Sequence, residues 1–529
     1  MRNQEILSLD GDWKLAAYEY VADRKDVQPD TETLDWMDAA VPGAVHYDLV
    51  KSGKLENPFA STQAAHAAEW VAQTDWIYTR EFELEQELSD GAAFALRIDG
   101  IDTYADIWLN DRLLGQTANA YRSYEFEVDA SMLRAGENRL IVHVKNHFRM
   151  TEGKADEAKR RLQVSRNPTA YRGKSLIRRY QRNFYSNSSL LNLGTGVLGI
   201  GIHKPVRLIA YPKLRIEESY FSVQQLTASQ ADVRVEVKLN RPLSEIGQAL
   251  TIEAVLQQPD MRQPAAVHSA AVTGGETDLR LTMQEPRLWW PRGYGGQPLY
   301  RLTLRLYDGT TLLHEIEKQV GIKQVEVIRE LPNGRKTFYL QVNGVKIHAR
   351  GSNLIPVDYL KVHDTWDVYE RLFRLMQASH HNTLRIWGGG AVETDKFYDR
   401  CDELGILIWQ DFFLHSNTYP DYDPEFVEEF RQESVELVKR IRAVPAWEFC
   451  AAATSRWKAG TNGTGRPTWT GSTANRSSKS CFLRLRPPIA PIFHMSSTRR
   501  TEANGLNPPL RAICITGAIS IMRRRIRSS

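Results

Sequence analysis

The chain has 529 residues, of which 42% are hydrophobic and 25% charged, the ordinary balance of a soluble globular protein with sizeable cores. At roughly 150 residues per domain, this length predicts three or four domains. The composition excludes a disordered, collagen-like or coiled-coil protein, and no run of 18 apolar residues indicates a membrane span. The first residues lack the apolar segment of a signal peptide, and four cysteines are too few for a disulfide scaffold, so we expect a cytoplasmic protein.

The net charge of +4 conceals a change in composition near Arg442. Residues 443–529 contain 14 Lys and Arg but only two acids, Glu448 and Glu502, a balance of +12. The preceding 442 residues therefore hold 54 of the 68 basic and 62 of the 64 acidic side chains, a balance of −8. Because the two regions carry opposite charge, the overall pI describes neither of them and does not indicate nucleic-acid affinity. We therefore expect no nucleic-acid partner, binding of DNA by the basic tail being the alternative, and the lack of a long apolar run predicts no membrane partner.

Residues 1–210 show the alternation of apolar and polar side chains that is typical of β-strands. Leu140, Val142 and Val144 share one face of such a segment, and an Asn110-Asp111 turn joins two others. Many short strands at this spacing predict a β-sandwich of the jelly-roll type.

The pattern continues in a smaller region, residues 211–327. Val233, Val235, Val237 and Leu239 alternate there with charged side chains, as in an antiparallel strand with one buried face. A region of this size and pattern predicts an immunoglobulin-like β-sandwich.

From residue 328 to residue 442, predicted strands alternate with predicted helices. Helices are expected to begin after Asp364 and at Asp423-Pro424, and one is expected to end on Gly405. Alternation of this kind indicates a parallel sheet, and the segment contains three such βα units. The last helix is expected to bury Phe426, Phe430, Leu437 and Ile441.

Three of the predicted strands end in polar residues. Asn353, Arg385 and Asp411 stand near these ends, and Trp387 with three glycines follows Arg385 in "RIWGGG". In βα barrels the active site lies at the carboxyl edge of the strands. There a Trp can stack on a sugar, an Arg can donate to hydroxyls, and glycines permit close approach. The glycine-rich segment alone is explained more simply as a flexible turn, so the convergence of three strand ends is the stronger indication of a site.

Six motifs occur in the order jelly roll, sandwich, barrel: "LDGDWKL", "VPGAVHYDLV", "LWWPRGYGGQPLY", "RGSNLIPVD", "RIWGGG" and "ILIWQDF". In this combination, over about residues 5–442, the chain resembles a family 2 glycoside hydrolase. The last three motifs resemble the β-mannosidase branch more than the β-galactosidases or β-glucuronidases. The resemblance implies that residues 328–442 are the first three βα units of a truncated (β/α)8 TIM barrel, after a sugar-binding-like jelly roll.

By this resemblance, Arg385, Trp387, Asp411 and Asn353 line the sugar-binding subsite. Many β-mannosidases also send a Trp-Asp-Trp-Gly loop from the first domain to that site, and here Asn192 stands against the aspartate. The resemblance further implies a retaining exo-glycosidase that removes terminal β-linked mannose from oligosaccharides. Such an enzyme needs two carboxylates and no cofactor or metal.

The two catalytic glutamates of the family are absent from their expected surroundings. After "VELVKRIR" the family would continue with His-Pro-Ser-Leu, a strand and Gly-Asn-Glu, whereas this chain continues with "AVPAWEFCAAATSRWKAG". Neither Glu448 nor Glu502 follows an Asn. We therefore assign no catalytic residue and expect the chain as written to be inactive.

A shifted reading frame explains this departure. When the codons of Val444–Ser455 are read from the third nucleotide of the preceding codon, the genetic code permits Arg-Pro-Ser-Leu-Gly-Ile-Leu-Cys-Gly-Gly-Asn-Glu. This string ends in the family's acid/base pair. We therefore predict that residues 443–529 are an out-of-frame tail, the alternative being a genuine, divergent basic tail.

Other interpretations stay open. The two sandwiches also fit a non-catalytic carbohydrate-binding protein, and the family resemblance also fits another specificity, such as a β-galactosidase or β-glucuronidase. The sequence does not indicate an oligomeric state. Because three βα units leave unpaired strand edges, we expect an aggregation-prone C-terminal half and a protease-resistant core that ends near residue 325–330.

Overall fold

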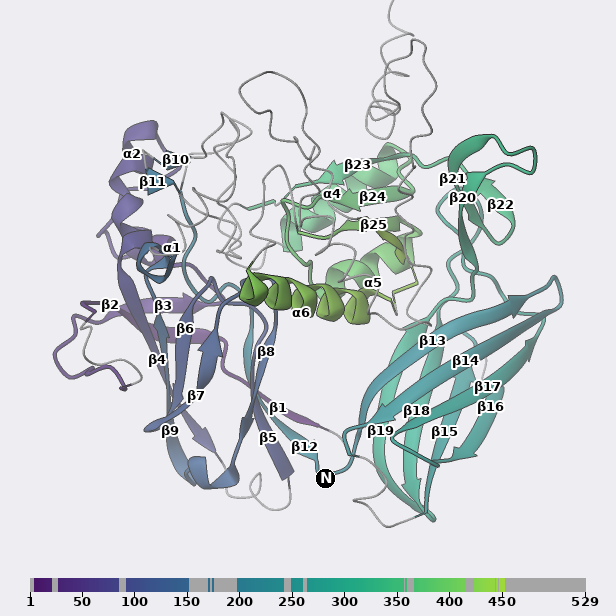
Figure 1. The fold of residues 1–529 in the computed structure, drawn as a ribbon, viewed down its shortest axis with the longest axis horizontal. Helices are drawn as coiled ribbons and strands as arrows, with labels where there is room; N and C mark the ends of the chain where they lie inside the picture. The colour runs from purple at the N-terminus through teal and green to yellow at the C-terminus, as the bar shows by residue number, and fades with distance from the viewer. Residues whose placement is uncertain are drawn as a thin grey trace, which may run out of the picture. The chain divides into compact units, whose positions relative to one another are not determined.

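The computed structural model describes residues 4–20, 27–84, 92–151, 170–171, 174–175, 197–241, 249–259, 264–355, 357–358, 366–413, 423–442, 444–445 and 447–451. Most of these residues belong to two antiparallel β-sandwiches, a small antiparallel sheet and a parallel sheet with helices (Figure 1). Within these ranges no helix is long and apolar enough to cross a membrane.

The first sandwich consists of two antiparallel sheets with a common apolar core. The larger sheet has the order β3-β2-β4-β9-β6-β7 and consists of Met37–Val41, Gly11–Tyr18, Asp75–Leu84, Gly136–Val144, Ala105–Leu109 and Arg112–Thr117. The smaller sheet has the order β1-β12-β5-β8 and consists of Glu5–Ser8, Val206–Pro212, Ala92–Ile98 and Tyr124–Val128. The predicted domain boundary at residue 210 therefore falls inside β12.

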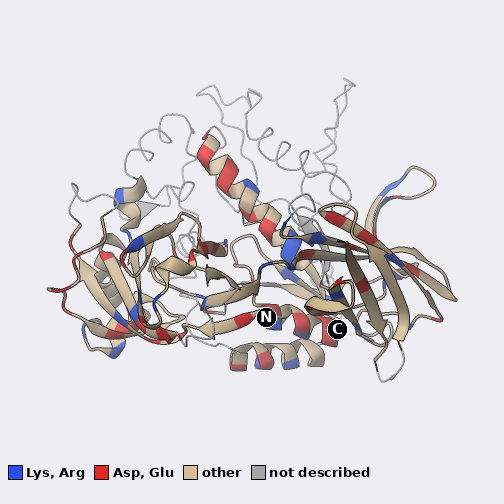
Figure 2. Cartoon of the chain, turned by 90° about the horizontal axis from the view of Figure 1, so that it is seen from below, with Lys and Arg blue, Asp and Glu red and all other residues tan. Residues whose placement is uncertain are grey.

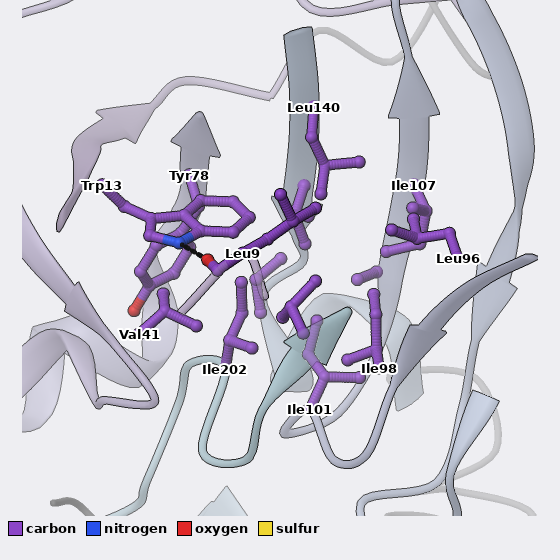
Figure 3. Packing of buried hydrophobic residues seen from close by; sticks show 14 of the residues in the cluster. Leu9, Trp13, Val41, Tyr78, Leu96, Ile98, Ile101, Ile107, Leu140 and Ile202 are labelled. Carbon is purple, nitrogen blue, oxygen red and sulfur yellow. Dashed lines mark hydrogen bonds between the residues drawn. The ribbon is translucent and has the colours of Figure 1, made fainter. Parts of the chain in front are cut away.

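The alternation predicted for β9 is confirmed, because Leu140, Val142 and Val144 are all 0% exposed. The predicted turn between β6 and β7 is also confirmed, with Asn110 at a φ of 53°. Apolar side chains of the two sheets meet in the core (Figure 3). There the Trp13 indole Nε1–H donates to the Leu9 carbonyl oxygen at 2.7 Å, so this buried ring leaves no polar group unsatisfied.

Short helices accompany the first sandwich: α1 (Val45–Lys51), α2 (Thr62–Ala67) and two turns of 3-10 helix, Glu69–Gln73 and Ala130–Met132. A two-stranded hairpin pairs β10 (Ala170–Tyr171) with β11 (Lys174–Ser175). Helix α1 begins within the "VPGAVHYDLV" motif and buries Asp48, whose Oδ1 accepts a hydrogen bond from the Ala40 N–H at 3.1 Å. Burial raises the pKa of Asp48 to about 7.

We predict that Asp48 makes the folded chain less stable as the pH rises. Between the usual Asp pKa near 4 and the folded pKa of about 7, the folded state keeps a proton that the unfolded state has lost. The free energy of unfolding should therefore fall by up to about 1.4 kcal/mol per pH unit in this window and level off above it. Urea unfolding of the natural chain and of Asp48→Asn, which cannot ionise, measures the effect. Identical pH slopes in the two proteins would contradict the prediction.

The second sandwich packs a three-stranded antiparallel sheet against a four-stranded one. The first has the order β13-β14-β17 and consists of Ile216–Leu226, Gln230–Leu239 and Glu276–Gln284. The second has the order β16-β15-β18-β19 and consists of Pro264–Ala271, Leu250–Gln257, Tyr300–Asp308 and Thr311–Val320. The four apolar residues predicted to line one face of β14 are at most 3% exposed, so that prediction is confirmed.

A small antiparallel sheet and a parallel sheet follow. The first, β20-β21-β22, consists of Val325–Glu330, Lys336–Val342 and Val345–Ile347, so the predicted boundary at residue 327 falls inside β20. The parallel sheet, β23-β24-β25-β26, consists of Gly351–Leu354, Thr383–Ile386, Leu407–Asp411 and Trp447–Ala451. Helices α4 (Trp366–Ala378), α5 (Asp395–Leu404) and α6 (Pro424–Ile441) alternate with these strands, as predicted.

Strand β26 was not predicted, because it lies in the region whose composition differs from the rest of the chain. Its backbone pairs in parallel with β25, and Ala451 stands opposite Asp411. Regular structure therefore continues past the predicted boundary at residue 442. Residues 452–529, the remainder of the predicted tail, lie outside the described residues.

Local signals determine the helix ends, as predicted. The Asp423 side chain accepts a hydrogen bond from the Glu425 N–H at 2.9 Å, with Pro424 in the first turn of α6. Gly405 ends α5 with a φ of 69°, a left-handed conformation that favours glycine. Asp364, the predicted cap of α4, lies outside the described residues. The four side chains predicted to be buried by α6 are buried: Phe426, Phe430, Leu437 and Ile441.

Acidic and basic residues occur along both strands and helices (Figure 2), and some of them pair helix α6 with the two sandwiches. Arg122 of the first sandwich pairs with Glu429 of α6 at 2.9 Å, and Lys439 near the end of α6 pairs with Glu218 of β13 at 2.7 Å. Trp289, 0% exposed, donates its indole N–H to the backbone of α5 at 2.9 Å. Helices of the parallel sheet are thus bound to both sandwiches.

These contacts change the expected extent of the protease-resistant core. We now predict that the core isolated by size exclusion after limited trypsin digestion retains the α6 peptides, because releasing α6 requires opening its contacts with both sandwiches. Arg122→Ala should release α6, whereas Arg134→Ala, which breaks an exposed pair with Asp111, should not. A core of the natural chain that ends near residue 330 would contradict this prediction and support the earlier expectation.

Candidate functional site

Three predicted site residues lie on adjacent parallel strands. Asn353 of β23 stands in register with Arg385 of β24, and Arg385 stands in register with Trp409 of β25. Asp411 is the last residue of β25. Because the carboxyl ends of parallel strands share one edge of the sheet, these residues come together at that edge.

The Asp411 carboxylate is the centre of this cluster. The Arg385 guanidinium donates to it twice, from Nη2 to Oδ2 at 2.5 Å and from Nε to Oδ1 at 3.2 Å. The Trp409 indole Nε1–H donates to Oδ1 at 3.1 Å, and the Gly388 backbone N–H donates to Oδ2 at 3.2 Å. These four hydrogen bonds occupy the acceptor positions of a carboxylate.

Asp411 is enclosed, with a side chain that is 0% exposed. Burial raises its pKa, while the hydrogen bonds from Arg385, Gly388 and Trp409 act in the opposite direction. Such a carboxylate holds Arg385 in place. The Arg385 side chain is 14% exposed and also donates to Oδ1 of the exposed Asn353 at 3.3 Å, so Arg385 and Asn353 are the members of the cluster with polar groups that solvent can reach.

Trp387 is half-buried and follows directly after β24. Its indole lies over Gly389, because a Cβ built on that glycine would stand 2.1 Å from the ring. The Gly390 N–H donates to the Trp387 carbonyl oxygen at 2.7 Å and closes the turn. The glycines thus permit the chain to approach its own tryptophan, a role that the sequence analysis did not anticipate.

Sequence reasoning misses a second row of hydrogen bonds behind the cluster. Gln410, 0% exposed, accepts from the Tyr398 hydroxyl of α5 at 3.1 Å and donates to the Asp411 carbonyl oxygen at 2.8 Å. It also misses Trp409. The sequence signal that could have identified Trp409 is the alternation of side chains along a strand. Trp409 and Asp411 are two residues apart on one strand and so share a face.

The predicted subsite residue Asn192 lies outside the described residues, so we do not place it in this cluster. Of the two acids of the tail, to which we assign no catalytic role, Glu502 also lies outside the described residues and Glu448 lies within β26. Across the described ranges, no group of three His, Cys, Asp or Glu side chains could hold a metal ion. The cluster therefore presents an arginine and an asparagine at the strand edge, and Trp387 follows Arg385 two residues later in the chain.

Models of known families match the two sandwich regions. A model described as a glycosyl hydrolase 2 galactose-binding domain-like matches residues 20–189. A second, described as glycosyl hydrolases family 2, matches residues 214–323.

The chain is similar to curated β-mannosidases. Beta-mannosidase B of Aspergillus niger is 28% identical over 426 residues, which cover 78% of this chain and 47% of that protein. Beta-mannosidase B of Neosartorya fischeri is 30% identical over 422 residues, which cover 79% and 48%. The chain thus spans about half the length of the curated relatives it matches.

Solved structures give the same picture of the fold. The β-D-mannosidase of Dictyoglomus thermophilum matches with a TM-score of 0.75 and 30% identity, over 91% of this chain and 56% of that one. A β-glucuronidase of Bacteroides uniformis matches with a TM-score of 0.62 and 16% identity, over 91% and 50%, a likeness that shows the fold alone.

We predict that Asp411→Ala destabilises the chain by about 3–5 kcal/mol, because it leaves the largely buried Arg385 guanidinium without its carboxylate. Asp411→Asn should cost less, since an amide of the same shape can still accept hydrogen bonds. Urea unfolding measures both. The matched control is Asp395→Ala, which breaks a pair with Arg440 at a side chain that is 79% exposed and should change stability by less than about 1 kcal/mol. Equal losses for Asp411→Ala and Asp395→Ala would refute the prediction.

Proposed function

The chain is a β-mannosidase-like protein of glycoside hydrolase family 2. We propose that the parent enzyme, the protein encoded in the restored reading frame, removes terminal β-linked mannose from oligosaccharides. The observation that carries this proposal is the exposed side of the Arg385–Asn353 pair at the strand edge, with the half-buried Trp387 two residues after Arg385 in the chain. The guanidinium can donate to sugar hydroxyls, the amide can donate or accept, and the indole can stack on an apolar sugar face.

The parallel sheet is, in this proposal, the first half of a (β/α)8 barrel. Its strands follow one another in chain order and alternate with helices, which is how such a barrel begins. Among the described strands, β23 and β26 each pair on one side only, whereas every strand of a closed barrel pairs on both. Phe338 of β21 also supports this assignment. Its ring lies 6.2 Å from that of Trp409 in β25, yet Phe338 is 49% exposed, so an apolar ring next to the sheet is left uncovered, as expected where part of a barrel is missing.

The chain as written lacks, in our proposal, the carboxylates that hydrolysis requires. A retaining glycosidase uses an acid/base and a nucleophile roughly 5–5.5 Å apart. Strand β26 supports the shifted frame, because it takes the fourth place in the sheet with Ala451 opposite Asp411. In the restored frame the Asn-Glu pair is encoded across Ala453–Ser455, directly after this strand end. The acid/base would then follow the strand edge that carries Arg385.

The test compares the 529-residue chain with a version whose frame is restored before Val444. We predict that the restored protein hydrolyses 4-nitrophenyl β-mannoside and that kcat/KM of the 529-residue chain is at least about a thousandfold lower. The matched control is a restored protein whose recovered glutamate is replaced by glutamine. Comparable kcat/KM for the two full-length proteins would overturn the proposal, and sequencing the locus checks the frame independently.

The choice of mannose rests on the relatives. Curated β-mannosidases are 28–30% identical to this chain, whereas the β-glucuronidase and putative β-galactosidase structures are 16–17% identical. A panel of aryl β-mannoside, β-galactoside and β-glucuronide on the restored protein decides between them. Hydrolysis of the galactoside but not of the mannoside would exclude mannose as the natural sugar.

Non-catalytic carbohydrate binding is the second candidate, favoured by the galactose-binding domain-like model that matches residues 20–189. Calorimetry of the full chain with manno-oligosaccharides tests it. Binding that Arg385→Ala abolishes would locate the sugar at the strand edge, whereas binding that survives this substitution would favour the sandwich.

A further inference from the structure

The first sandwich contributes a loop that contacts the chain just beyond Asp411. This loop, residues 119–123, is part of the connection between β7 (which ends at Thr117) and β8 (which begins at Tyr124). Its Tyr121 ring stacks on the Phe413 ring, with centroids 4.6 Å apart and planes 14° apart. Both rings are buried, and Phe413 is the second residue after Asp411. A stack of two buried rings fixes the direction in which the chain leaves β25.

The loop is also hydrogen-bonded to α6. The Asn119 side chain, 0% exposed, donates from Nδ2 to Oε2 of Glu433 at 3.0 Å. Its Oδ1 accepts from the Tyr121 N–H at 3.0 Å, which fixes the shape of the loop. Asn119 therefore joins the backbone that carries Tyr121 to the helix.

Arg122 neutralises a row of acids on α6. Glu429, Glu433 and Glu436 recur at spacings of four and three residues, so they share one face of the helix. Arg122 donates to Glu429 at 2.9 Å and to Glu436 at 2.8 Å. Burial raises the pKa of Glu436, and the Arg122 charge acts in the opposite direction. Without Arg122 these carboxylates would repel one another, so α6 requires this arginine to lie against the loop.

Helix α6 and the loop hold the residues after Asp411 through two neighbouring aromatic rings. Phe412 contacts Phe430 of α6, with centroids 6.4 Å apart and planes at 73°. The next residue, Phe413, stacks on Tyr121. Asp411 precedes both, so a displacement of either ring would move the carboxylate that orients Arg385.

We propose that the loop 119–123 positions the Arg385–Asp411 pair, with Tyr121 as a positioning residue that acts through Phe413. The inference rests on the proposed function for what Arg385 binds, but not for how Asp411 is held. The first sandwich thereby determines the placement of an arginine on a strand of the parallel sheet.

The Trp409 indole provides the readout, because its N–H donates to Asp411 Oδ1 at 3.1 Å. Its signal in the full chain, labelled with 15N-tryptophan, is assigned by Trp409→Phe. Other indoles serve as internal references. Trp13 and Trp76 donate to carbonyl oxygens within the first sandwich, and Trp289 donates to the carbonyl oxygen of Asp402.

Tyr121→Ala is expected to shift or broaden the Trp409 signal while the three reference signals stay in place. Tyr121→Phe keeps the ring and should restore the Trp409 signal. Arg122→Ala should change the signal as well, whereas Arg134→Ala, at an exposed pair of the same sandwich, should not.

An unchanged Trp409 signal in Tyr121→Ala, with the reference signals intact, would overturn the proposal. If Tyr121→Ala loses the reference signals, Tyr121→Leu, which keeps apolar volume without a ring, decides in the same way. Failure of the restored protein to hydrolyse mannosides would leave these spectra unaffected, so the two proposals fail separately.

Discussion

A fully buried carboxylate with four hydrogen-bond donors is the interaction on which the described site depends. The Asp411 side chain has no exposed surface, so water cannot replace a hydrogen-bond donor that is removed. Loss of any one donor would therefore leave a buried carboxylate oxygen without a partner, which costs free energy. This requirement explains the residues around it. Arg385 contributes two donors, Trp409 contributes an indole N–H, and Gly388 contributes a backbone N–H from the turn after β24. Arg385, which we propose contacts the sugar, is therefore held by an enclosed carboxylate and its other donors.

Contacts between the sandwiches and the helices also affect the position of Asp411, and they join residues that are far apart in the sequence. Ion pairs on the surface of the first sandwich, such as Lys14–Asp38 with side chains 59% and 81% exposed, contribute little, because water screens both charges. Arg122 is different, since its side chain is 15% exposed and faces several carboxylates of α6. Removing it would leave those carboxylates partly buried without a counter-charge. The electrostatic interactions that matter most for the site thus lie where one element meets another.

The features that the sequence predicts are local ones. The alternation in β9 and β14, the Asp423 cap and the terminal Gly405 each depend on a few neighbouring residues, and the structure contains all of them. The strand-end positions of Asn353, Arg385 and Asp411 follow from the strand-helix alternation.

The features that sequence reasoning misses depend on distant contacts. Asn119 and Glu433 are 314 positions apart, and no periodicity connects them. The difference between Asp411 and Arg385, one enclosed and one partly exposed, also appears only when the third dimension is known. Similarly, the resemblance identifies the "VPGAVHYDLV" motif but gives no role to Asp48, whose raised pKa results from burial.

If the proposed shift of reading frame holds, strand β26 is a case in which a strand is preserved while an active site is lost. The segment Trp447–Ala451 and the string Gly-Ile-Leu-Cys of the other frame are both short and mostly apolar, which is typical of a strand in a parallel sheet. Pairing with β25 uses backbone groups that every residue except proline supplies, so the sheet tolerates either sequence. General acid catalysis has no such tolerance, because a carboxylic acid must lie within hydrogen-bond reach of the glycosidic oxygen. Under the proposed frame, the chain keeps the arginine that contacts the sugar and loses the group that protonates the leaving oxygen. In our proposal, sugar binding and hydrolysis depend on the same strand edge in the frame-restored protein and are separated in this chain.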